Sequence, residues 1–294
     1  MKKLLRRTAI GLGLLAVLLT GVVLYLGSWD PLATQFETEV ASVPVPTDAA
    51  SIKRGEYVAR ALGICALCHG EDFGGKLMQD HPIYGYVHTP NLTPGKGGVG
   101  YYFQDVDWVR AVRYGVKPNG AGIAFMPTDH FYQLSDADLG AMIAFLKQVP
   151  PIDNDKAAIR LGLPARALLN SGNKGVMVRA LVIDRQAPRL DPANKAEYLL
   201  GVGGCDFCHG PVLTGGQGPE PGAPRAPDIT RTGRMAQWSF EQFATVMRTG
   251  KKPDGSVIFW MHMPYAGYRN LNDEDLHLMF DRLRATSPVV ITSH

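Results

Sequence analysis

Two short stretches of the chain place cysteine and histidine at a spacing that suits one kind of chemistry. They are Cys65-Ala66-Leu67-Cys68-His69 and Cys205-Asp206-Phe207-Cys208-His209. In C-x-x-C-H, two thiols one helical turn apart can each form a thioether with a haem vinyl group, and the next imidazole can bind the iron. The chain has four cysteines, and these stretches contain all of them. We therefore expect two covalently bound c-type haems, held by thioethers at Cys65, Cys68, Cys205 and Cys208, with His69 and His209 as iron ligands.

Three other uses of the cysteines fit less well. A thioredoxin-like C-x-x-C needs a βαβ pattern around it and no histidine after it. A zinc site made of two C-x-x-C pairs usually has them about 15–20 residues apart, and the gap here is far longer. A disulfide in each pair would leave both histidines without a role.

The N-terminus has the pattern of a membrane-spanning helix. Four positive charges in residues 1–7 precede an uncharged, largely apolar run from Thr8 to Trp29, and about 20 apolar residues suffice to cross a bilayer. The next charges are acidic, so the positive-inside rule puts the remainder on the periplasmic side of a bacterial inner membrane. A cleaved signal peptide is the alternative, but its apolar region would be about 7–15 residues long. We expect residues 1–29 to be an uncleaved single-pass anchor.

The segment after the anchor and the overall composition bear on the exported part. Residues 30–50 contain Val43-Pro44-Val45-Pro46 and little periodicity, so we expect an extended tether. The net charge is only +3, and no basic stripe lies outside the anchor, which argues against a nucleic-acid partner. The 33 glycines and 21 prolines indicate a folded part rich in loops, as in small domains whose porphyrin supplies much of the core.

The exported part is one unit written twice. Each copy contains Glu-Tyr before the haem motif, then a Pro-(Asn/Asp)-hydrophobic-Thr segment, Arg-x-Gly, Lys-Pro-(Asn/Asp)-Gly, Met-Pro and an acidic helix start. The matching positions are Glu56-Tyr57 and Glu197-Tyr198, Pro90–Thr93 and Pro227–Thr230, Trp108–Gly115 and Phe243–Gly250, Lys117–Gly120 and Lys252–Gly255, Met126-Pro127 and Met263-Pro264, and Leu134–Leu139 and Leu271–Leu276. We expect two domains, 51–150 and 191–290, joined by a connector at 151–190 that contains a short helix near 165–169.

Each unit is predicted to be mainly helical. In the first, we expect helices over 51–68, over 104–114 with Gly115 as its stop, and from the N-cap Ser135 to the Pro150-Pro151 pair. Asn272 is the matching cap in the second unit. Aromatic residues are expected to pack around a flat apolar cofactor, and any of them could also hydrogen-bond a haem propionate, as could Arg113 or Arg248. The aromatic residues are Tyr102, Trp108, Trp238 and Trp260.

Taken together, these segments resemble the class I cytochrome c domains, and most closely the cytochrome subunits of periplasmic, membrane-attached dehydrogenases for alcohols, sugar acids and nicotinate. The resemblance covers residues 51–290. Many such subunits have three haem domains, whereas this chain has two haem motifs. The resemblance implies a mainly α fold of two tandem class I cytochrome c domains. It also implies that the carbonyls of Pro90 and Pro227 accept hydrogen bonds from His69 and His209.

The sixth iron ligand is expected to be a methionine, because Met/His ligation is the arrangement of cytochromes c. In the first unit Met126 precedes Pro127 and the acidic helix, while His81 and His88 are competing ligands. Met78 and Met142 are better explained as loop and core residues. In the second unit Met263 lies eight residues before Leu271, as Met126 lies eight before Leu134, so Met263 is preferred over Met261 and His262. His277 is expected at the surface, and His130 and His294 have no assigned role.

Iron with two protein ligands has no open position for a substrate, which favours electron transfer over catalysis. We therefore expect a non-enzymatic carrier of the respiratory chain, or an electron-transfer subunit. It would relay electrons from a dehydrogenase or quinol-oxidising complex to a terminal oxidase or soluble cytochrome. The alternative is a dihaem enzyme, of the peroxidase or thiosulfate-oxidising type, with one open or labile iron. A non-catalytic assembly subunit is a third possibility.

Overall fold

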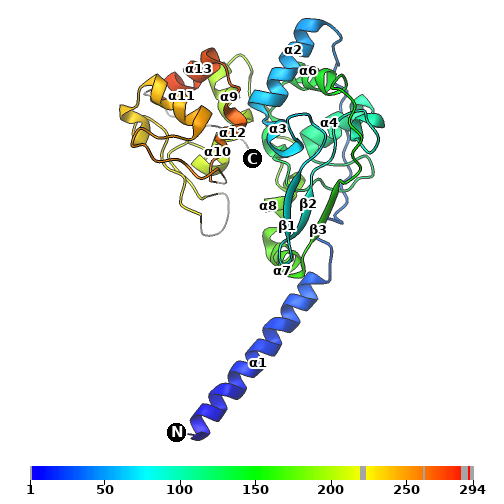
Figure 1. Ribbon diagram of the computed structural model, residues 1–294, viewed down its shortest axis with the longest axis vertical. Coiled ribbons are helices and arrows are strands. Elements are labelled where there is room, and N and C mark those ends of the chain that lie inside the picture. The colour runs from blue at the N-terminus through cyan, green and yellow to red at the C-terminus, as the bar shows by residue number, and fades with distance from the viewer. Residues whose placement is uncertain (1, 219–222, 261, 286–290, 292–294) are drawn as a thin grey trace.

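The structure is a computed structural model that describes residues 2–218, 223–260, 262–285 and 291. A single long helix, α1 (Lys2–Gly27), projects from a mainly helical body (Figure 1). The α1 helix is long and apolar enough to span a membrane by length and composition, a test that a signal sequence also passes. The body contains two units, drawn side by side in Figure 1.

Two helices of the first unit, α4 (Asp105–Tyr114) and α6 (Asp136–Leu146), form where the sequence pattern predicts them. Ser135 caps the N-terminus of α6 by accepting a hydrogen bond from Asp138 N at 3.1 Å, and Gly115 ends α4 in the left-handed conformation. A Cβ on Gly55 of α2 would lie 1.9 Å from Ala141 O, so glycine lets the backbones of α2 and α6 touch. The helices are α2 (Ala49–Tyr57), η1 (Val58–Leu62), α3 (Cys65–His69), η2 (Val99–Tyr101), α4 (Asp105–Tyr114), α5 (Thr128–Tyr132) and α6 (Asp136–Leu146).

The predicted continuous helix over 51–68 is wrong in one respect. The chain widens into a π-turn at η1, and Ile64 then adopts the left-handed conformation, with φ 45°, before α3 begins. This break separates the C-x-x-C-H helix α3 from the helical segment before it. A β-branched residue in that conformation is strained, and such strain concentrates at functional sites.

A small antiparallel sheet is added to the first unit, which the helical pattern does not predict. Its strands are β1 (Leu77–His81), β2 (Gly85–His88) and β3 (Ala158–Leu161), in the order β1-β2-β3. Residues 77–88 form a hairpin, and the connector supplies the third strand, with Gly85 paired to Leu161 and His88 to Ala158. The connector is therefore tied to the first unit through backbone pairing.

Residues 30–48 are not a free tether. They contain no helix, as expected, but they lie against the first unit: Phe36 N donates to Gly120 O at 2.9 Å, and Gln35 forms an isolated bridge with Ala121. Val43 is buried in the main core. Burial of this apolar side chain and pairing of the backbone favour the docked segment over an extended, solvated one.

The connector packs on the body, and its expected short helix is α7 (Leu163–Leu168). Further short helical turns come after it, and Val178 and Ala180 form a small second core with Val116. These turns are η3 (Leu169–Asn173), α8 (Lys174–Met177) and η4 (Arg179–Leu181).

The second unit repeats the order of the first with fewer residues. Asn272 caps α13 by accepting from Asp275 N at 2.8 Å, as predicted. Its helices are α9 (Lys195–Val202), α10 (Cys205–His209), η5 (Arg234–Gln237), α11 (Phe240–Thr249), α12 (Tyr265–Tyr268) and α13 (Asp273–Arg284). Residues 286–290, the end of the expected domain 191–290, lie outside the described residues.

One hydrophobic core runs through both units. It joins Leu139 of α6 and Leu276 of α13 to residues that precede the two C-x-x-C-H segments, such as Val58 of η1 and Leu200 of α9. The two units therefore share buried apolar surface, which holds them together more firmly than a linker does.

Candidate haem sites

The first C-x-x-C-H segment forms the short helix α3, and its histidine is held from behind. His69 Nδ1 lies 2.9 Å from Pro90 O, which confirms the predicted partner. Burial lowers the pKa of His69, so the neutral ring donates from Nδ1 to the carbonyl. That bond fixes the tautomer and leaves Nε2 as the nitrogen for a metal.

The second segment repeats this arrangement in α10. His209 Nδ1 lies 2.8 Å from Pro227 O, again as predicted, and burial lowers the pKa of His209. Gly204, with φ 68°, replaces Ile64 at the left-handed position before the helix. The bond at His69 is partly buried, whereas the bond at His209 is exposed.

The loops after the two motifs have the same backbone. The carbonyl of His69 accepts from Gly75 N at 2.8 Å, and that of His209 accepts from Gly215 N at 2.9 Å. Phe73 and Leu213 take the same strained conformation, with φ 60° and 58°, and both are fully buried. The repeat therefore extends to strained positions that residue types alone do not reveal.

None of the four cysteines is bonded to another, so neither pair is a disulfide. Burial raises the pKa of Cys65 and Cys205 to about 12, so both thiols are protonated at neutral pH when no metal or haem is bound. Among the described residues no three His, Cys, Asp or Glu side chains gather into a metal cluster. The thiols are thus positioned for something other than a shared zinc site, and their spacing beside an oriented imidazole fits covalent haem.

The two candidate sixth ligands have matching surroundings. Met126 and Met263 are both half-buried against the main core. Each carbonyl accepts from the residue two positions on, Thr128 N or Tyr265 N, at 2.8 Å in both units. The turn around Met263 therefore corresponds to that around Met126, while Met261 lies outside the described residues.

The competing histidines have structural partners. His81 Nδ1 accepts from Ile83 N at 3.2 Å at the tip of the hairpin, and His88 Nδ1 lies 2.9 Å from Thr89 O. His262 packs edge-on against Phe259. His277 is exposed and stacks on Phe240, with ring centroids 3.3 Å apart, as expected for a surface residue.

The aromatic residues divide into buried and exposed ones. Trp108 is 2% exposed, and its Nε1 has no hydrogen-bond partner among the described residues. A buried donor of this kind suits an acidic group of a bound cofactor, since an unpaired one is costly. Trp238 packs against the core, but Tyr102 and Trp260 are at least half exposed. Tyr102 and Trp260 pack edge-on or tilted against a neighbouring phenylalanine.

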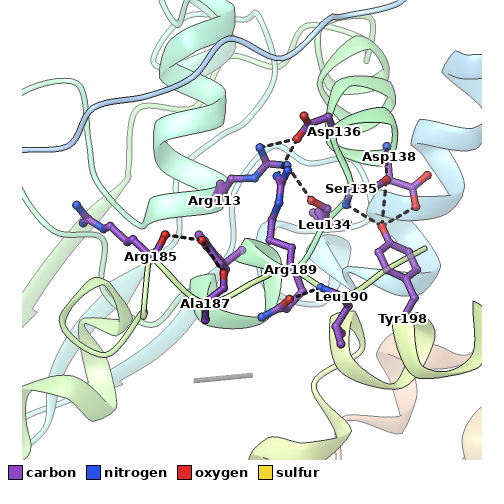
Figure 2. Close-up of polar contacts among 12 residues, drawn as sticks. Arg113, Leu134, Ser135, Asp136, Asp138, Arg185, Ala187, Arg189, Leu190 and Tyr198 are labelled. Carbon is purple, nitrogen blue, oxygen red and sulfur yellow. Dashed lines mark hydrogen bonds and ion pairs between the residues drawn. The ribbon is translucent and has the colours of Figure 1, made fainter. Parts of the chain in front are cut away.

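The two matching arginines bind the starts of the terminal helices. Arg113 lies 2.9 Å from Asp136 and donates to Leu134 O at 2.7 Å; Arg189 of the connector also pairs with Asp136 (Figure 2). Arg248 pairs with Asp273 at 2.5 Å in the second unit. These contacts occupy the arginine groups that the sequence left open for a haem propionate, although Arg113 Nε keeps no partner among the described residues.

A tyrosine of each unit hydrogen-bonds to the start of a helix in the other unit. Tyr198 OH of the second unit donates to Asp138 Oδ2 at 2.8 Å and accepts from Ser135 N at 3.1 Å (Figure 2). Tyr57 OH of the first unit makes the matching bonds to Asp275 Oδ2, at 2.6 Å, and Asn272 N, at 3.3 Å. This reciprocity is that of two similar units related by an approximate two-fold axis.

The carboxylates of this exchange are also paired with cations. Arg54 donates to Asp138 at 2.7 Å, and Lys195 lies 2.8 Å from Asp275. Burial and the facing carboxylate raise the pKa of both tyrosines. The repeated Glu-Tyr and acidic helix start were visible in the sequence, but nothing in them showed that each tyrosine reaches the other unit.

The same interface brings the two haem motifs toward each other. A Cβ on Gly267 of α12 would lie 2.8 Å from Ile64 beside the first motif, and one on Gly204 would lie 2.8 Å from His130 of α5. His130 Nε2 is 3.9 Å from Asp206 Oδ1, inside the second motif. His130 is thus an interface residue, which a lone histidine in the sequence did not indicate.

Comparison with known proteins gives one family and several relatives. Residues 52–150 match the cytochrome c family. The chain is 31% identical to the cytochrome c subunit of alcohol dehydrogenase (quinone) from Gluconobacter oxydans, over 82% of this chain and 54% of the relative. It is 37% identical to the gluconate 2-dehydrogenase cytochrome c subunit of Pantoea cypripedii, over 55% of this chain and 38% of the relative. It is 31% identical to a nicotinate dehydrogenase subunit of Pseudomonas putida, over 61% of this chain and 16% of the relative.

The chain thus spans about half, or less, of the length of these relatives. The expected resemblance is confirmed for residues 52–150, which match the cytochrome c family, in a chain that is similar to the cytochrome c subunits of alcohol and gluconate dehydrogenases.

Proposed function

We propose that the chain is a membrane-anchored electron-transfer protein with two c-type haems and no catalytic centre of its own. The observation that supports it best is the pair of imidazoles, His69 and His209, each oriented by a proline carbonyl at the same place in two matching loops. Residues 51–150 and 191–290 would be the two cytochrome c domains. Bound haem supplies a one-electron couple, whose potential the protein tunes through ligands and burial.

Different residues would hold different parts of each haem. Cys65 and Cys68, or Cys205 and Cys208, supply the thioethers, and His69 or His209 the proximal nitrogen. Met126 and Met263 supply the distal sulfur, which is soft and favours ferrous iron. Because both motifs lie beside the interface between the units, electrons would pass from one unit to the other within the chain.

The relatives indicate the partners. Two of them are named as cytochrome c subunits of an alcohol and a gluconate dehydrogenase, so the donor would be a periplasmic dehydrogenase or a quinol-oxidising complex. The acceptor would be a terminal oxidase or a soluble cytochrome. With α1 left uncleaved, the chain would sit in the bacterial inner membrane with both units in the periplasm.

Haem stoichiometry tests the proposal. The purified full-length chain should keep two haems after acid-acetone extraction, and its mass should exceed that of the polypeptide by two haems. Replacing Cys205 and Cys208 with alanine should remove one haem and leave the other. A wild-type chain with one haem, or cysteines that alkylate freely, would exclude the two-haem protein; rapid cyanide binding would instead favour an open iron and a dihaem enzyme.

A further inference from the structure

The end of α1 is held directly by the body. Asn170 Nδ2 donates to Leu26 O at 2.8 Å and to Trp29 O at 3.2 Å, and so satisfies a carbonyl at the end of the helix. A Cβ on Gly27 would lie 2.5 Å from the Leu163 side chain and 2.8 Å from its carbonyl. Glycine at this position lets α1 touch α7 with no spacer between them.

The length of α1 then determines where α7 lies relative to the bilayer. From Thr8 to Gly27 a helix rises about 29 Å at 1.5 Å per residue, which matches a hydrocarbon core of about 30 Å. If α1 spans the bilayer, as proposed above, Gly27 lies at the outer edge of the hydrocarbon. The α7 helix, packed on Gly27, then lies among the lipid headgroups.

The hairpin tip lies beside the same point. Gly162 N donates to Tyr84 O at 3.3 Å, and a Cβ on Gly162 would lie 2.1 Å from Ile83 O, so the tip touches the residue before α7. Figure 1 shows the hairpin and α7 at the foot of the body, where α1 leaves it. His81 packs against Tyr84 and accepts from Ile83 N, which fixes the tip.

Large apolar side chains are exposed around this point. We call them the α1-exit patch: Tyr25 (66% exposed), Trp29 (63%), Ile83 (50%), Tyr84 (59%) and Leu163 (40%). They come from three separate segments, which the contacts of Gly27 and Gly162 bring together. Tyrosine and tryptophan are the residues preferred at the membrane–water interface.

The charge of the adjoining connector suits an anionic surface. Residues 156–183 contain five cations and no carboxylate. Arg179 pairs with Asp129, but Arg166 belongs to α7 itself. Apolar and aromatic side chains beside cations are the combination by which peripheral segments bind anionic bilayers.

We propose that the α1-exit patch seats the body on the phospholipid surface, so that the two units are held at a fixed orientation to the membrane. The inference rests on the proposed anchor and goes beyond it, because a single membrane-spanning helix does not by itself fix how the body is oriented to the bilayer. The occupant of the patch is the headgroup region of the bilayer; a protein partner is the competing occupant.

Site-directed spin labelling of the full-length holoprotein tests this in nanodiscs of phosphatidylethanolamine and phosphatidylglycerol. The native cysteines are taken by the thioethers, so Ile83→Cys can be labelled alone, with Val257→Cys (Val257 is 62% exposed, in the second unit) as the matched control. We expect the label at 83 to be severalfold less accessible to a water-soluble nickel chelate than the label at 257. Equal accessibility at both positions would overturn the seating.

The anchor is tested separately, with the same variants, by alkaline carbonate extraction of the native membranes in which they are produced. Retention of the chain together with equal label accessibility rejects the seating and keeps the anchor. Release by carbonate rejects the anchor, and with it the seating. Protection of position 83 in native membranes but not in nanodiscs would reject lipid as the occupant in favour of a partner protein.

Discussion

The first and second units present their haem motifs on the same backbone but surround them differently. The His–Pro bonds, strained loop residues, methionine turns and arginine-bound helix starts all recur. The first unit adds a sheet, a buried Trp108 and a partly buried histidine bond. The second has Phe243 in place of Trp108, an exposed histidine bond and a buried carboxylate, Asp206, inside its motif.

With a haem bound in each unit, as proposed, this contrast would give the two haems different reduction potentials. Ligand type is expected to be the same in both, so burial and nearby charge must distinguish them. A negative charge and greater solvent exposure both stabilise ferric haem. We therefore expect the haem of the second unit to have the lower potential, and the following changes test or remove that asymmetry.

The largest effect is expected from exchanging a distal ligand. Met126→His should lower the potential of the first haem on the order of 200 mV, since axial ligands set haem potentials over several hundred millivolts. Met263→His should do the same to the second haem alone. Spectroelectrochemical titration measures both, and the sulfur-to-iron absorption band should fall by about half in each variant. Met261→Leu is the control; loss of the band there would show that the second unit is misaligned.

The next effect concerns the bond exchange between the units. Tyr198→Phe should reduce the free energy of unfolding by about 1.5–3 kcal/mol, because it removes a buried hydrogen bond to a charged group. Tyr57→Phe should cost less, since Tyr57 is less buried than Tyr198, which is 2% exposed. Denaturant titration measures both losses, and the double variant should make the connector more sensitive to protease. Equal stability of all variants would contradict a shared interface.

Asp206 offers a pH-dependent test of the asymmetry. Burial raises its pKa to about 7, with nearby Asp129 acting in the same direction and Arg179 opposing. Asp206 is therefore neutral below about pH 7 and charged above it. The charged form favours ferric haem, so the second potential should fall by tens of millivolts as the pH rises through 7. In Asp206→Asn the side chain is neutral at every pH, so the pH dependence of the second haem's potential should disappear while the potential of the first haem stays unchanged. A pH dependence that persists in this variant would place the titrating group elsewhere.

Much of this arrangement could be predicted from the sequence, and the exceptions have a common cause. Helix caps at Ser135 and Asn272, the stop at Gly115 and the partners Pro90 and Pro227 follow from local pattern or from the resemblance, and the structure confirms them. The break at Ile64, the added sheet and the docked segment 30–48 depend on contacts distant in sequence. The tyrosine exchange and His130 belong to an interface between repeats, which a repeat pattern does not place.

The smallest effect is expected at Trp108, where the two units can be made alike. Trp108→Phe copies Phe243 of the second unit and removes an indole donor that has no partner among the described residues. If Nε1 donates to an acidic group of the first haem, its loss leaves that charge less compensated. The first potential should then fall by about 20 mV, and stability by about 1 kcal/mol, the worth of one hydrogen bond.

Trp108→Phe also removes packing volume, so stability alone does not decide the role of the indole. The reverse change, Phe243→Trp, is the matched control, since it adds an indole to the unit that lacks one. Loss of packing would destabilise the first unit without moving one potential selectively, whereas loss of a donor to the cofactor must move the first potential and leave the second. Unchanged haem potentials in Trp108→Phe would show that the buried indole serves packing alone. The difference in potential between the two haems would then come from the solvent exposure of the second site and from Asp206.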